Sequence, residues 1–317
     1  MSYNVIVVMD PIEKIKIVKD STFAMMLEAQ RRGLPLLYVK PGHLQITQDQ
    51  AQAWVAPVTV FDDANHWFEL GEYVLHTFGA DDVILMRVDP PVDHNYIHDT
   101  HILSMAQTQG ALIVNDPQGL RDYNEKLGAL PFPQCCPPTL VSRSAGALKA
   151  FVAEHGQAVL KVLDGMGGKS IFRASHGDPN VNVILETLTN NGQDLAMAQK
   201  YIPEITAGDK RILLIDGEPV DYVLARIPQG DEFRGNLAAG GRGEGRPISE
   251  RDRWIASQVG PVMRDNNMLF VGLDVIGDYL TEVNVTSPTC IRELDAQFGL
   301  NIAGLLFDAI ERKRGAQ

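Results

Sequence analysis

The chain has 317 residues, of which 45% are hydrophobic and 21% are charged, proportions typical of a globular protein with a sizeable core. The formal net charge of −12 argues against general affinity for nucleic acid or for an anionic membrane surface, because both ligands are polyanions. An anionic ligand would therefore need a local cluster of cations. No apolar run approaches the roughly 20 residues of a membrane span. The three cysteines do not make a disulfide framework, so we expect a cytoplasmic protein in a reducing compartment.

The first third of the chain alternates strands and helices. Residues 4–9 are typical of a buried strand, a helix follows the N-cap pair at 20–21, and residues 35–40 form the next strand. This order predicts a parallel sheet covered by helices. A further strand at 83–88 carries Arg87 near its carboxyl end, where open α/β sheets bind ligands, although a structural ion pair is the alternative. The pattern over 45–75 predicts no element.

A break in the pattern follows, because four prolines lie within eight residues at 131–138. A helix at 122–130, which contains Lys126, precedes this break. After the break we expect helices at 144–154 and 182–191 and strands at 158–162, 171–174 and 195–201. The last of these strands ends in Gln199, Lys200, Tyr201 and Ile202.

A glycine-rich loop, DGMGGKS at 164–170, joins two of these strands. Because glycine has no Cβ, the backbone amides of Gly165, Gly167 and Gly168 can approach phosphate oxygens closely. The loop is not a Walker A motif, since Leu163 occupies the position of the first glycine. Lys161, inside the apolar strand VLKVL, needs a bound anion or a nearby carboxylate. A turn without a ligand is the alternative.

Arginines dominate the polar positions of the next segment. Strands at 210–216 and 219–227 carry Arg211 and Arg226 among apolar residues, which indicates carboxylate or phosphate partners. The glycine-rich stretch 228–245 contains Arg234 and Asn236. A loop of this length is either a functional lid, able to close over a charged intermediate, or a mobile surface loop.

The segment 269–293 predicts a β-hairpin, in which Glu282 and Asn284 share one face. A three-residue loop at 277–279 would place Asp274 opposite Glu282, on the same face. A two-residue turn would instead pair Asp274 with Thr281 and point it away. Three oxygen donors on one face would suit Mg²⁺, whereas an ordinary solvated hairpin is the alternative. A helix at 249–267 precedes the hairpin and a final helix is expected at 296–312.

Seven segments in this order resemble the ATP-grasp superfamily and, within it, bacterial glutathione synthetase. They are VMDPI (8–12), ILMRVDPP (84–91), LRDYNEKL (120–127), LDGMGGKSIFR (163–173), ARIPQG (225–230), RGNLAAGGRGE (234–244) and EVNVTSPTCIRE (282–293). The resemblance implies an α/β plus α+β protein in three parts. These are an N-terminal parallel-sheet α/β domain at 1–123, an ATP-grasp central or lid domain at 124–202, and a C-terminal ATP-grasp catalytic domain with antiparallel sheets at 203–317.

The same resemblance implies a reaction in which ATP drives the joining of γ-glutamylcysteine to glycine through an acyl phosphate, giving glutathione, ADP and phosphate. It implies that ATP is bound by Lys126, Lys161, Gly165, Gly167, Gly168, Gln199, Lys200, Tyr201, Ile202, Arg211 and Asn236. It implies catalytic roles for Arg211, Arg226, Arg234 and Asn236. Asp274, Glu282 and Asn284 would bind Mg²⁺, with Mn²⁺ as a substitute, and the peptide would contact Arg87, Ser287, Thr289 and Arg292.

The family leads us to expect a cytoplasmic homotetramer with small-molecule substrates and with neither nucleic acid nor membrane as a partner. Two alternatives stay open. One is another ATP-grasp carboxylate–amine ligase, of the D-alanine–D-alanine type, and the other is an ATP-binding protein without enzymatic activity.

Overall fold

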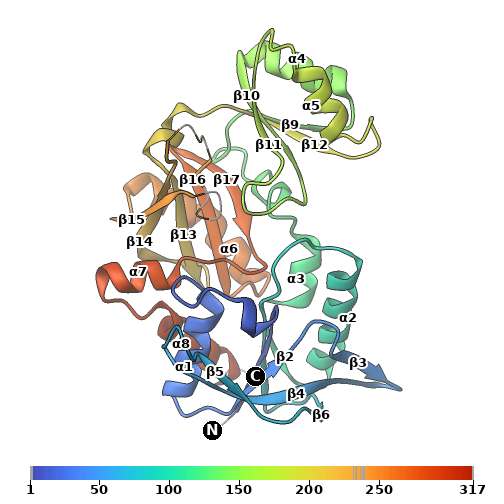
Figure 1. The fold of residues 1–317 in the computed structure, drawn as a ribbon, viewed down its shortest axis with the longest axis vertical. Coiled ribbons are helices and arrows are strands. Elements are labelled where there is room, and N and C mark those ends of the chain that lie inside the picture. Colours follow the sequence, from blue (N-terminus) through green and yellow to red (C-terminus); the bar gives the residue numbers. More distant parts are fainter. Residues whose placement is uncertain (1–2, 231, 233, 236, 238–239, 316–317) are drawn as a thin grey trace.

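The structure is a computed structural model that describes residues 3–230, 232, 234–235, 237 and 240–315. Three sheets follow one another along the long axis of the molecule (Figure 1). The N-terminal sheet lies at one end, the sheet of the central segment lies at the other end, and the C-terminal sheet lies between them. The chain therefore visits both ends of the molecule before it forms the middle.

The N-terminal sheet is built as the sequence predicts. Its parallel strands are β1 (Asn4–Val8), β2 (Leu36–Val39), β7 (Asp82–Met86) and β8 (Leu112–Val114). Helix α1 (Ser21–Arg31) begins where the carboxylate of Asp20 accepts a hydrogen bond from the backbone N–H of Phe23 at 2.7 Å. A short 3₁₀ helix, η1 (Ile12–Lys14), precedes α1, and α2 (His94–Thr108) precedes β8. The predicted parallel sheet is confirmed.

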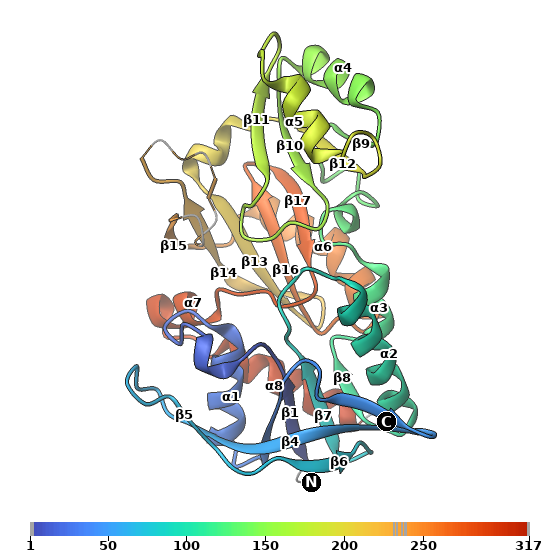
Figure 2. The same cartoon turned by 45° about the vertical axis from the view of Figure 1, so that its right-hand side comes forward.

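Residues 45–75, for which the sequence predicts nothing, form antiparallel strands. These are β3 (Leu44–Thr47), the long β4 (Gln50–Val60), β5 (Phe68–Leu70) and β6 (Val74–Thr77, which runs just past the segment). Strand β4 pairs with β2, β3, β5 and β6, so strands on both of its sides set its environment. Figure 2 shows β3, β4 and β6 running out to one side at the base of the molecule.

The central segment folds around its own small core. Strands β9 (Thr139–Ser142), β10 (Gln157–Val162), β11 (Ile171–Ser175) and β12 (Ala196–Lys200) form an antiparallel sheet, packed against α4 (Ala145–His155) and α5 (Val181–Leu188). The predicted helix at 122–130 is wrong. Helix α3 (Pro117–Asp122) ends earlier and a 3₁₀ turn, η2 (Leu127–Ala129), follows it. The side-chain oxygen of Asn124 accepts hydrogen bonds from the backbone N–H groups of Lys126 and Leu127, both at 3.1 Å, and so replaces helical backbone pairing.

The C-terminal sheet contains five antiparallel strands in the order β15-β14-β13-β16-β17. They are β13 (Asp209–Ile215), β14 (Glu218–Ile227), β15 (Arg242–Pro247), β16 (Phe270–Ile276) and β17 (Tyr279–Asn284). The 3₁₀ helix η3 (Pro203–Ala207) leads into β13, and α6 (Glu250–Asp265) packs against β14. The predicted loop at 228–245 is too long by four residues, because 242–245 pair with β14.

The end of the chain forms two helices, not the one predicted at 296–312. Helix α7 (Ile291–Phe298) ends at Gly299, which has a φ of 65°, and α8 (Ile302–Gly315) follows. Helix α8 returns to α1, where Arg32 forms ion pairs with Asp308 at 2.6 Å and Glu311 at 2.8 Å. Apolar residues of α8, among them Leu306 and Phe307, belong to the same buried core as β1 and α1.

The three sheets lie within the ranges 1–123, 124–202 and 203–317, respectively. The division of the chain into three domains at those limits stays a prediction. Over the described part of the chain, no helix combines the length and the apolar character needed to cross a bilayer.

Candidate active site

The hairpin of β16 and β17 places Asp274 directly opposite Glu282. Its turn has only two residues, Gly277 and Asp278, which by itself would pair Asp274 with Thr281. A β-bulge prevents this, because Thr281 is an extra residue in β17 and its hydroxyl donates a hydrogen bond to the carbonyl oxygen of Asp274 at 3.1 Å. The turn is therefore the two-residue alternative, yet Asp274 shares the face of Glu282 and Asn284 that the three-residue alternative expects.

Two buried arginines from the neighbouring strands converge on Asp274. Arg211 Nε lies 2.6 Å from Asp274 Oδ1, and an Arg226 terminal nitrogen lies 2.9 Å from Oδ2. The same Arg226 nitrogen lies 2.6 Å from Asp209 Oδ2. Burial alone would raise the pKa of Asp274, but the two guanidinium groups outweigh it and hold this pKa below its usual range. Burial raises the pKa of Asp209 to about 6, despite Arg226.

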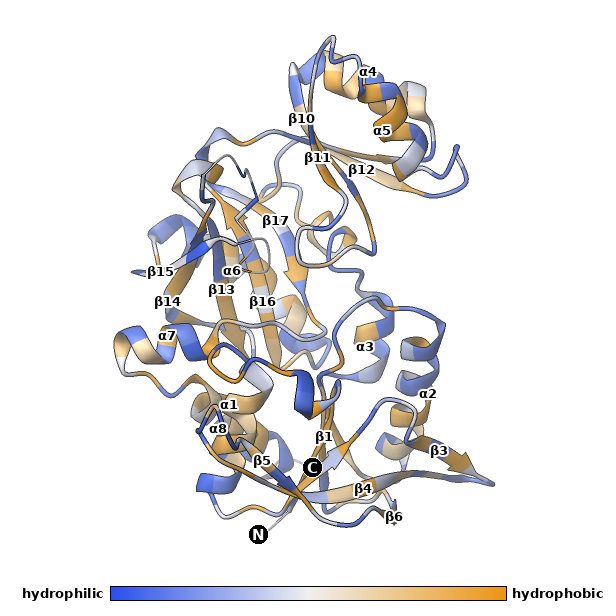
Figure 3. Ribbon diagram, viewed as in Figure 1, coloured by the Kyte–Doolittle hydropathy of each residue, from blue (hydrophilic) through white to orange (hydrophobic). Residues whose placement is uncertain are grey.

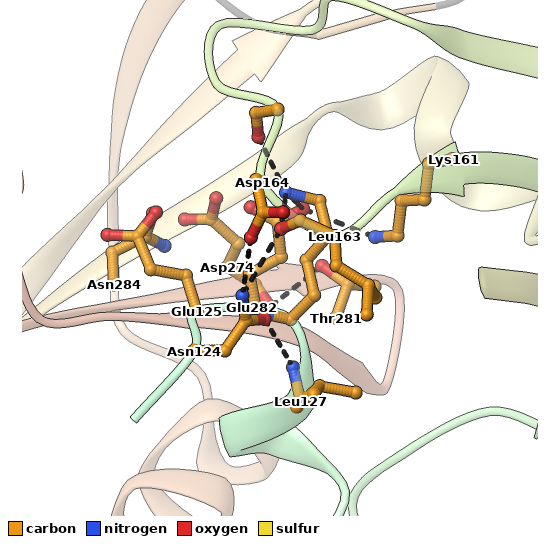
Figure 4. A network of polar contacts seen from close by, with 12 residues as sticks. Asn124, Glu125, Leu127, Lys161, Leu163, Asp164, Asp274, Thr281, Glu282 and Asn284 are labelled. Atoms are coloured by element: carbon orange, nitrogen blue, oxygen red, sulfur yellow. Dashed lines mark hydrogen bonds and ion pairs between the residues drawn. The ribbon is translucent and has the colours of Figure 1, made fainter. Parts of the chain in front are cut away.

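Two lysines from the central segment converge on Glu282. Lys161 Nζ, on β10, lies 3.2 Å from Glu282 Oε1, and Lys126 Nζ lies 3.8 Å from the same oxygen. Figure 4 shows Lys161 reaching from β10 toward the hairpin that carries Asp274, Glu282 and Asn284. The lysines outweigh the effect of burial and lower the pKa of Glu282. Lys161 therefore has the carboxylate partner that its place in an apolar strand requires.

These side chains line a cavity of about 670 Å³ between the central and C-terminal sheets. The cavity also takes in loops of the N-terminal region, so all three parts of the chain contribute to it. The predicted residues in its lining are Lys126, Lys161, Gly165, Gly167, Gly168, Gln199, Lys200, Tyr201, Ile202, Arg211, Arg226, Arg234, Asp274, Glu282, Asn284, Ser287 and Thr289. Residues far apart in the sequence thus meet around one cavity, and their roles toward a nucleotide and a peptide stay predictions.

The glycine-rich loop closes one side of this cavity. Gly167 and Gly168 have φ values of 62° and 83°, a conformation that a side chain would strain. Lys126 Nζ donates to the carbonyl oxygen of Gly165 at 2.6 Å, and Arg234 donates to that of Gly168 at 2.7 Å. The guanidinium group of Arg234 also pairs with Glu232. Arg234 thereby connects the segment after β14 to the glycine-rich loop.

Two of the predicted substrate residues lie outside the cavity lining. Arg87 is buried over the ring of Phe270 and donates to the hydroxyl of Thr22 at 3.0 Å and to the carbonyl oxygen of Pro288 at 2.8 Å. Burial lowers its pKa to about 10. Arg87 therefore supports the loop that carries Ser287, and its direct contact with the peptide stays a prediction. The guanidinium group of Arg292 instead pairs with Asp62 at 2.9 Å. Asn236 lies outside the described residues.

Three lysine side chains of the N-terminal region also line the cavity, and the sequence analysis does not predict them. Lys14, Lys16 and Lys19 follow β1 and line the cavity beside the loop of Ser287. Their position after the carboxyl end of a parallel strand is a usual place for a ligand, and this signal was available in the sequence. Asp209 and Glu125 were also missed, because nothing in their local pattern separates them from surface acids.

The donor set on the hairpin fits Mg²⁺. Asp274 and Glu282 have lowered pKa values and so carry charge at neutral pH, and Asn284 adds an amide on the same face. Among the residues that the structure describes, no group of three or more His, Cys, Asp or Glu side chains is placed to hold a metal. Two acids and one amide leave positions for water and phosphate, which is the coordination Mg²⁺ prefers and Mn²⁺ accepts.

Solved structures share the fold of this chain. D-cycloserine synthetase DcsG superposes with a TM-score of 0.67 over 98% of this chain and 99% of that chain, at 13% identity. The ATP-grasp ligase PsnB, in complex with a precursor peptide and AMPPNP, gives a TM-score of 0.62 over 99% and 98% at 14% identity. At such low identity the likeness shows the fold alone, and that fold is the predicted ATP-grasp fold with an added N-terminal domain.

The sequence itself carries a closer relationship. Residues 3–121 match the model of the prokaryotic glutathione synthetase N-terminal domain, and residues 125–299 match that of the prokaryotic glutathione synthetase ATP-grasp domain. The chain is 74% identical to the glutathione synthetase of Xanthomonas axonopodis pv. citri, over 98% of each chain. It is 57% identical to that of Pseudomonas putida over the full length of both. The chain belongs to the prokaryotic glutathione synthetase family.

Proposed function

We propose that this protein is an ATP-dependent ligase that joins γ-glutamylcysteine to glycine, forming glutathione, ADP and phosphate. The observation that carries the proposal is one cavity in which buried arginines and lysines surround two carboxylates and an amide, inside an acidic chain of this family. Such a site suits phosphoryl transfer, which needs positioning and charge neutralisation more than covalent help from the protein.

The nucleotide would lie between the central and C-terminal sheets. Lys126 and Lys161 would bind the phosphates, and the backbone of the glycine-rich loop would close over them. The segment from Gln199 to Ile202, which lines the cavity at the end of β12, would run along the adenine. In support, both lysines already reach across to the hairpin and need only exchange the carboxylate of Glu282 for a phosphate oxygen.

Asp274, Glu282 and Asn284 would hold Mg²⁺, or Mn²⁺ in its place. The bound ion would neutralise charge on the phosphates and fix their orientation. The side chains of the protein supply the rest of the electrostatic environment.

We infer two chemical steps. The cysteinyl carboxylate of γ-glutamylcysteine attacks the γ-phosphorus of ATP, the bond from that phosphorus to the bridging oxygen of ADP breaks, and an acyl phosphate forms. The amine of glycine then attacks the acyl carbon, loses a proton and displaces phosphate. Arg211 and Arg226 would neutralise the transferring group from the sheet, and Arg234 and Asn236 would do so from the segment after β14, which would also exclude water.

The peptide would lie against the loop after β17, where Ser287 and Thr289 line the cavity. Arg87 would support this loop through its hydrogen bond to the carbonyl oxygen of Pro288. Arg292 would contact the peptide from α7. We also propose that the enzyme is a cytoplasmic homotetramer, with small molecules and no nucleic acid or membrane as partners.

The test is ADP release by the purified protein with ATP, Mg²⁺ and γ-glutamylcysteine, with and without glycine. We expect rapid release that requires both substrates and yields one glutathione per ADP. Turnover only with D-alanine would instead indicate the D-alanine–D-alanine type of ligase. Nucleotide binding without ligation of any dipeptide and amine would indicate a binding protein.

A further inference from the structure

One buried carboxylate that lines the cavity has no role in the two proposed chemical steps. Asp209 is the first residue of β13, whose sequence DKRILLI changes from charged to apolar along the strand (Figure 3). The strand register places it opposite Arg226 on β14. Its exposed fraction is only 8%, although it lines the cavity together with Arg211 and Arg226. A charge buried to this extent needs partners for its oxygens.

Only one oxygen of Asp209 has a partner among the residues that the structure describes. Oδ2 lies 2.6 Å from an Arg226 terminal nitrogen, whereas Oδ1 is buried and accepts no hydrogen bond. That Arg226 nitrogen is shared, because it also lies 2.9 Å from Asp274 Oδ2. An acceptor buried without a donor destabilises the folded chain. A group of this kind therefore calls for an explanation, such as a ligand that supplies the donor.

The nearest lysines are already paired elsewhere. Lys210, the next residue in β13, points to the opposite face of the strand and pairs with Asp252. The two lysines that reach the hairpin pair with Glu282. In the proposed reaction Arg226 neutralises the transferring phosphoryl group. Asp209 would then lack a full counter-charge unless a cation arrives with the substrates.

The proposed substrates bring two ammonium groups, and their positions differ. The α-ammonium group of γ-glutamylcysteine lies at the opposite end of the dipeptide from the carboxylate that is phosphorylated. The ammonium group of glycine must lie beside the acyl phosphate, because its nitrogen forms the new bond to the acyl carbon. Asp209 is bonded to Arg226, which is proposed to contact that phosphate, so its position suits the amine of glycine.

We propose that Asp209 binds the ammonium group of the acceptor, glycine, and holds its nitrogen beside the acyl phosphate. This inference rests on the proposed function, because it names the subsite of the second substrate. Oδ1 of Asp209 accepts a hydrogen bond from the ammonium group, while Oδ2 keeps its contact with Arg226. The two neighbouring side chains thus match the two reactants, with Arg226 facing the phosphate and Asp209 facing the amine.

The chain segment after β14 passes directly over this carboxylate. Gly235 lines the cavity, and a methyl group placed on it would come within 3.1 Å of Asp209 Cβ and 2.3 Å of the carbonyl oxygen of Arg226. The backbone at Gly235 can approach Asp209 this closely because it has no side chain. The contact helps to keep water from Asp209, and an ion pair with an ammonium group is stronger there than in water.

The experiment compares two acceptor amines in the wild type and in Asp209→Asn. The amine of glycine is charged at neutral pH, whereas hydroxylamine is largely uncharged and needs no carboxylate to receive it. With either acceptor the nitrogen attacks the acyl carbon, loses a proton and displaces phosphate, giving glutathione or a hydroxamate. We expect Asp209→Asn to raise the KM for glycine about tenfold or more, and to keep hydroxamate formation within about threefold of the wild type.

Two further variants complete the comparison. Asp209→Ser, a smaller replacement, should show the same split between the two acceptors, and calorimetric titration with ADP shows that each variant has folded. The matched control is Asp221→Asn, which removes an exposed carboxylate from β14 and should leave both reactions unchanged.

An unchanged KM for glycine in both Asp209 variants would overturn the proposal. An equal loss of both reactions would also overturn it, because Asp209 would then act only by holding Arg226 in place. A wild type that releases no ADP with γ-glutamylcysteine and either amine would refute the proposed function itself, and the subsite with it.

Discussion

Gly272 lies directly against the side chain of Arg211, since a methyl group placed on Gly272 would come within 2.9 Å of Arg211 Cδ and 2.9 Å of Pro288 Cβ. The absence of a side chain at Gly272 leaves room for the side chain of Arg211, whose register partner Asp274 lies two residues further along the same strand. The glycine therefore sets the direction of a proposed catalytic arginine without itself touching a substrate.

Gly272→Ala should move the guanidinium group of Arg211 and lower the turnover number more than it weakens nucleotide binding. Overpacking of this kind costs roughly 1–3 kcal/mol of folding stability. Steady-state kinetics and ADP titration measure the two effects separately. Gly243→Ala is the matched control, because a methyl group there meets only the flexible end of Leu224 at 3.3 Å. Equal kinetics for the two variants would contradict the role of Gly272.

Arg226→Ala should reduce turnover with γ-glutamylcysteine and glycine about 10- to 150-fold, corresponding to roughly 1.5–3 kcal/mol for one charged contact to a phosphate. The comparison variant is Arg253→Ala, which removes a surface arginine paired with Asp221. Surface pairs of this kind contribute little, so that variant should be close to wild type. Unchanged turnover in Arg226→Ala would remove this residue from the site.

Glu282→Gln tests whether Lys126 and Lys161 exchange the carboxylate of Glu282 for a phosphate when a nucleotide binds. Lys161 and Lys126 are neutralised by Glu282, so the substitution should free them for phosphate and tighten ADP binding several-fold in the presence of a chelator. The same variant should lose most of the gain in affinity that Mg²⁺ gives the wild type. Calorimetric titration with ADP, with and without Mg²⁺, measures both effects. Weaker binding in chelator and an undiminished Mg²⁺ effect would argue against this arrangement.

The pH dependence of stability follows from Asp274. Its pKa is lower in the folded protein than in the unfolded chain, so its contribution to stability is fully present above about pH 4, the unfolded value, and is lost as the pH falls toward the folded pKa. Asp274→Asn should therefore destabilise the protein by roughly 3–5 kcal/mol at neutral pH, because it breaks a buried ion pair.

Urea unfolding of wild type and Asp274→Asn at pH 7, 5 and 3.5 measures this difference. It should be the same at the two higher values and smaller at the lowest. Asp221→Asn, which removes the exposed carboxylate paired with Arg253, should show little change at any of the three. A difference that grows as the pH falls would have the wrong sign.

Shortening the segment between β14 and β15 tests its role as a lid. Replacing residues 228–241 by a short glycine–serine linker keeps β15, which pairs with β14 from Arg242 onward. ATP binding should stay close to wild type, while more phosphate is released per glutathione formed, because water reaches the acyl phosphate. An equal loss of nucleotide affinity and of ligation would contradict a lid function.

Much of the fold follows from local pattern. The βαβ opening is predicted because the strand and helix periods are complete within short windows and Asp20 caps α1. The four strands near 45–75 are not predicted, because β4 is defined by pairing with strands on both sides, and its many alanines and glutamines give no strong period. Gly299 indicates the break between α7 and α8, because glycine commonly ends a helix. The apolar pattern that continues across it favours a single helix.

The site shows the same division. Glu282 and Asn284 are predicted to share a face from spacing alone, whereas the position of Asp274 depends on a bulge at Thr281 that no local rule identifies. Lys161 is predicted to need an anionic partner, but only the folded chain brings Glu282 to it. Arg87 resembles a ligand-binding residue by its place at a strand end, and its actual partners are Thr22 and the loop at Pro288.

The return of α8 to α1 bears on how the protein is made. Because Leu306 and Phe307 complete the core around β1, the first domain to leave the ribosome lacks part of its interior until the last helix has been synthesised. A nascent chain that stops before residue 302 should expose this apolar surface to chaperones and proteases. Stable folding of the N-terminal half therefore depends on the synthesis of α8.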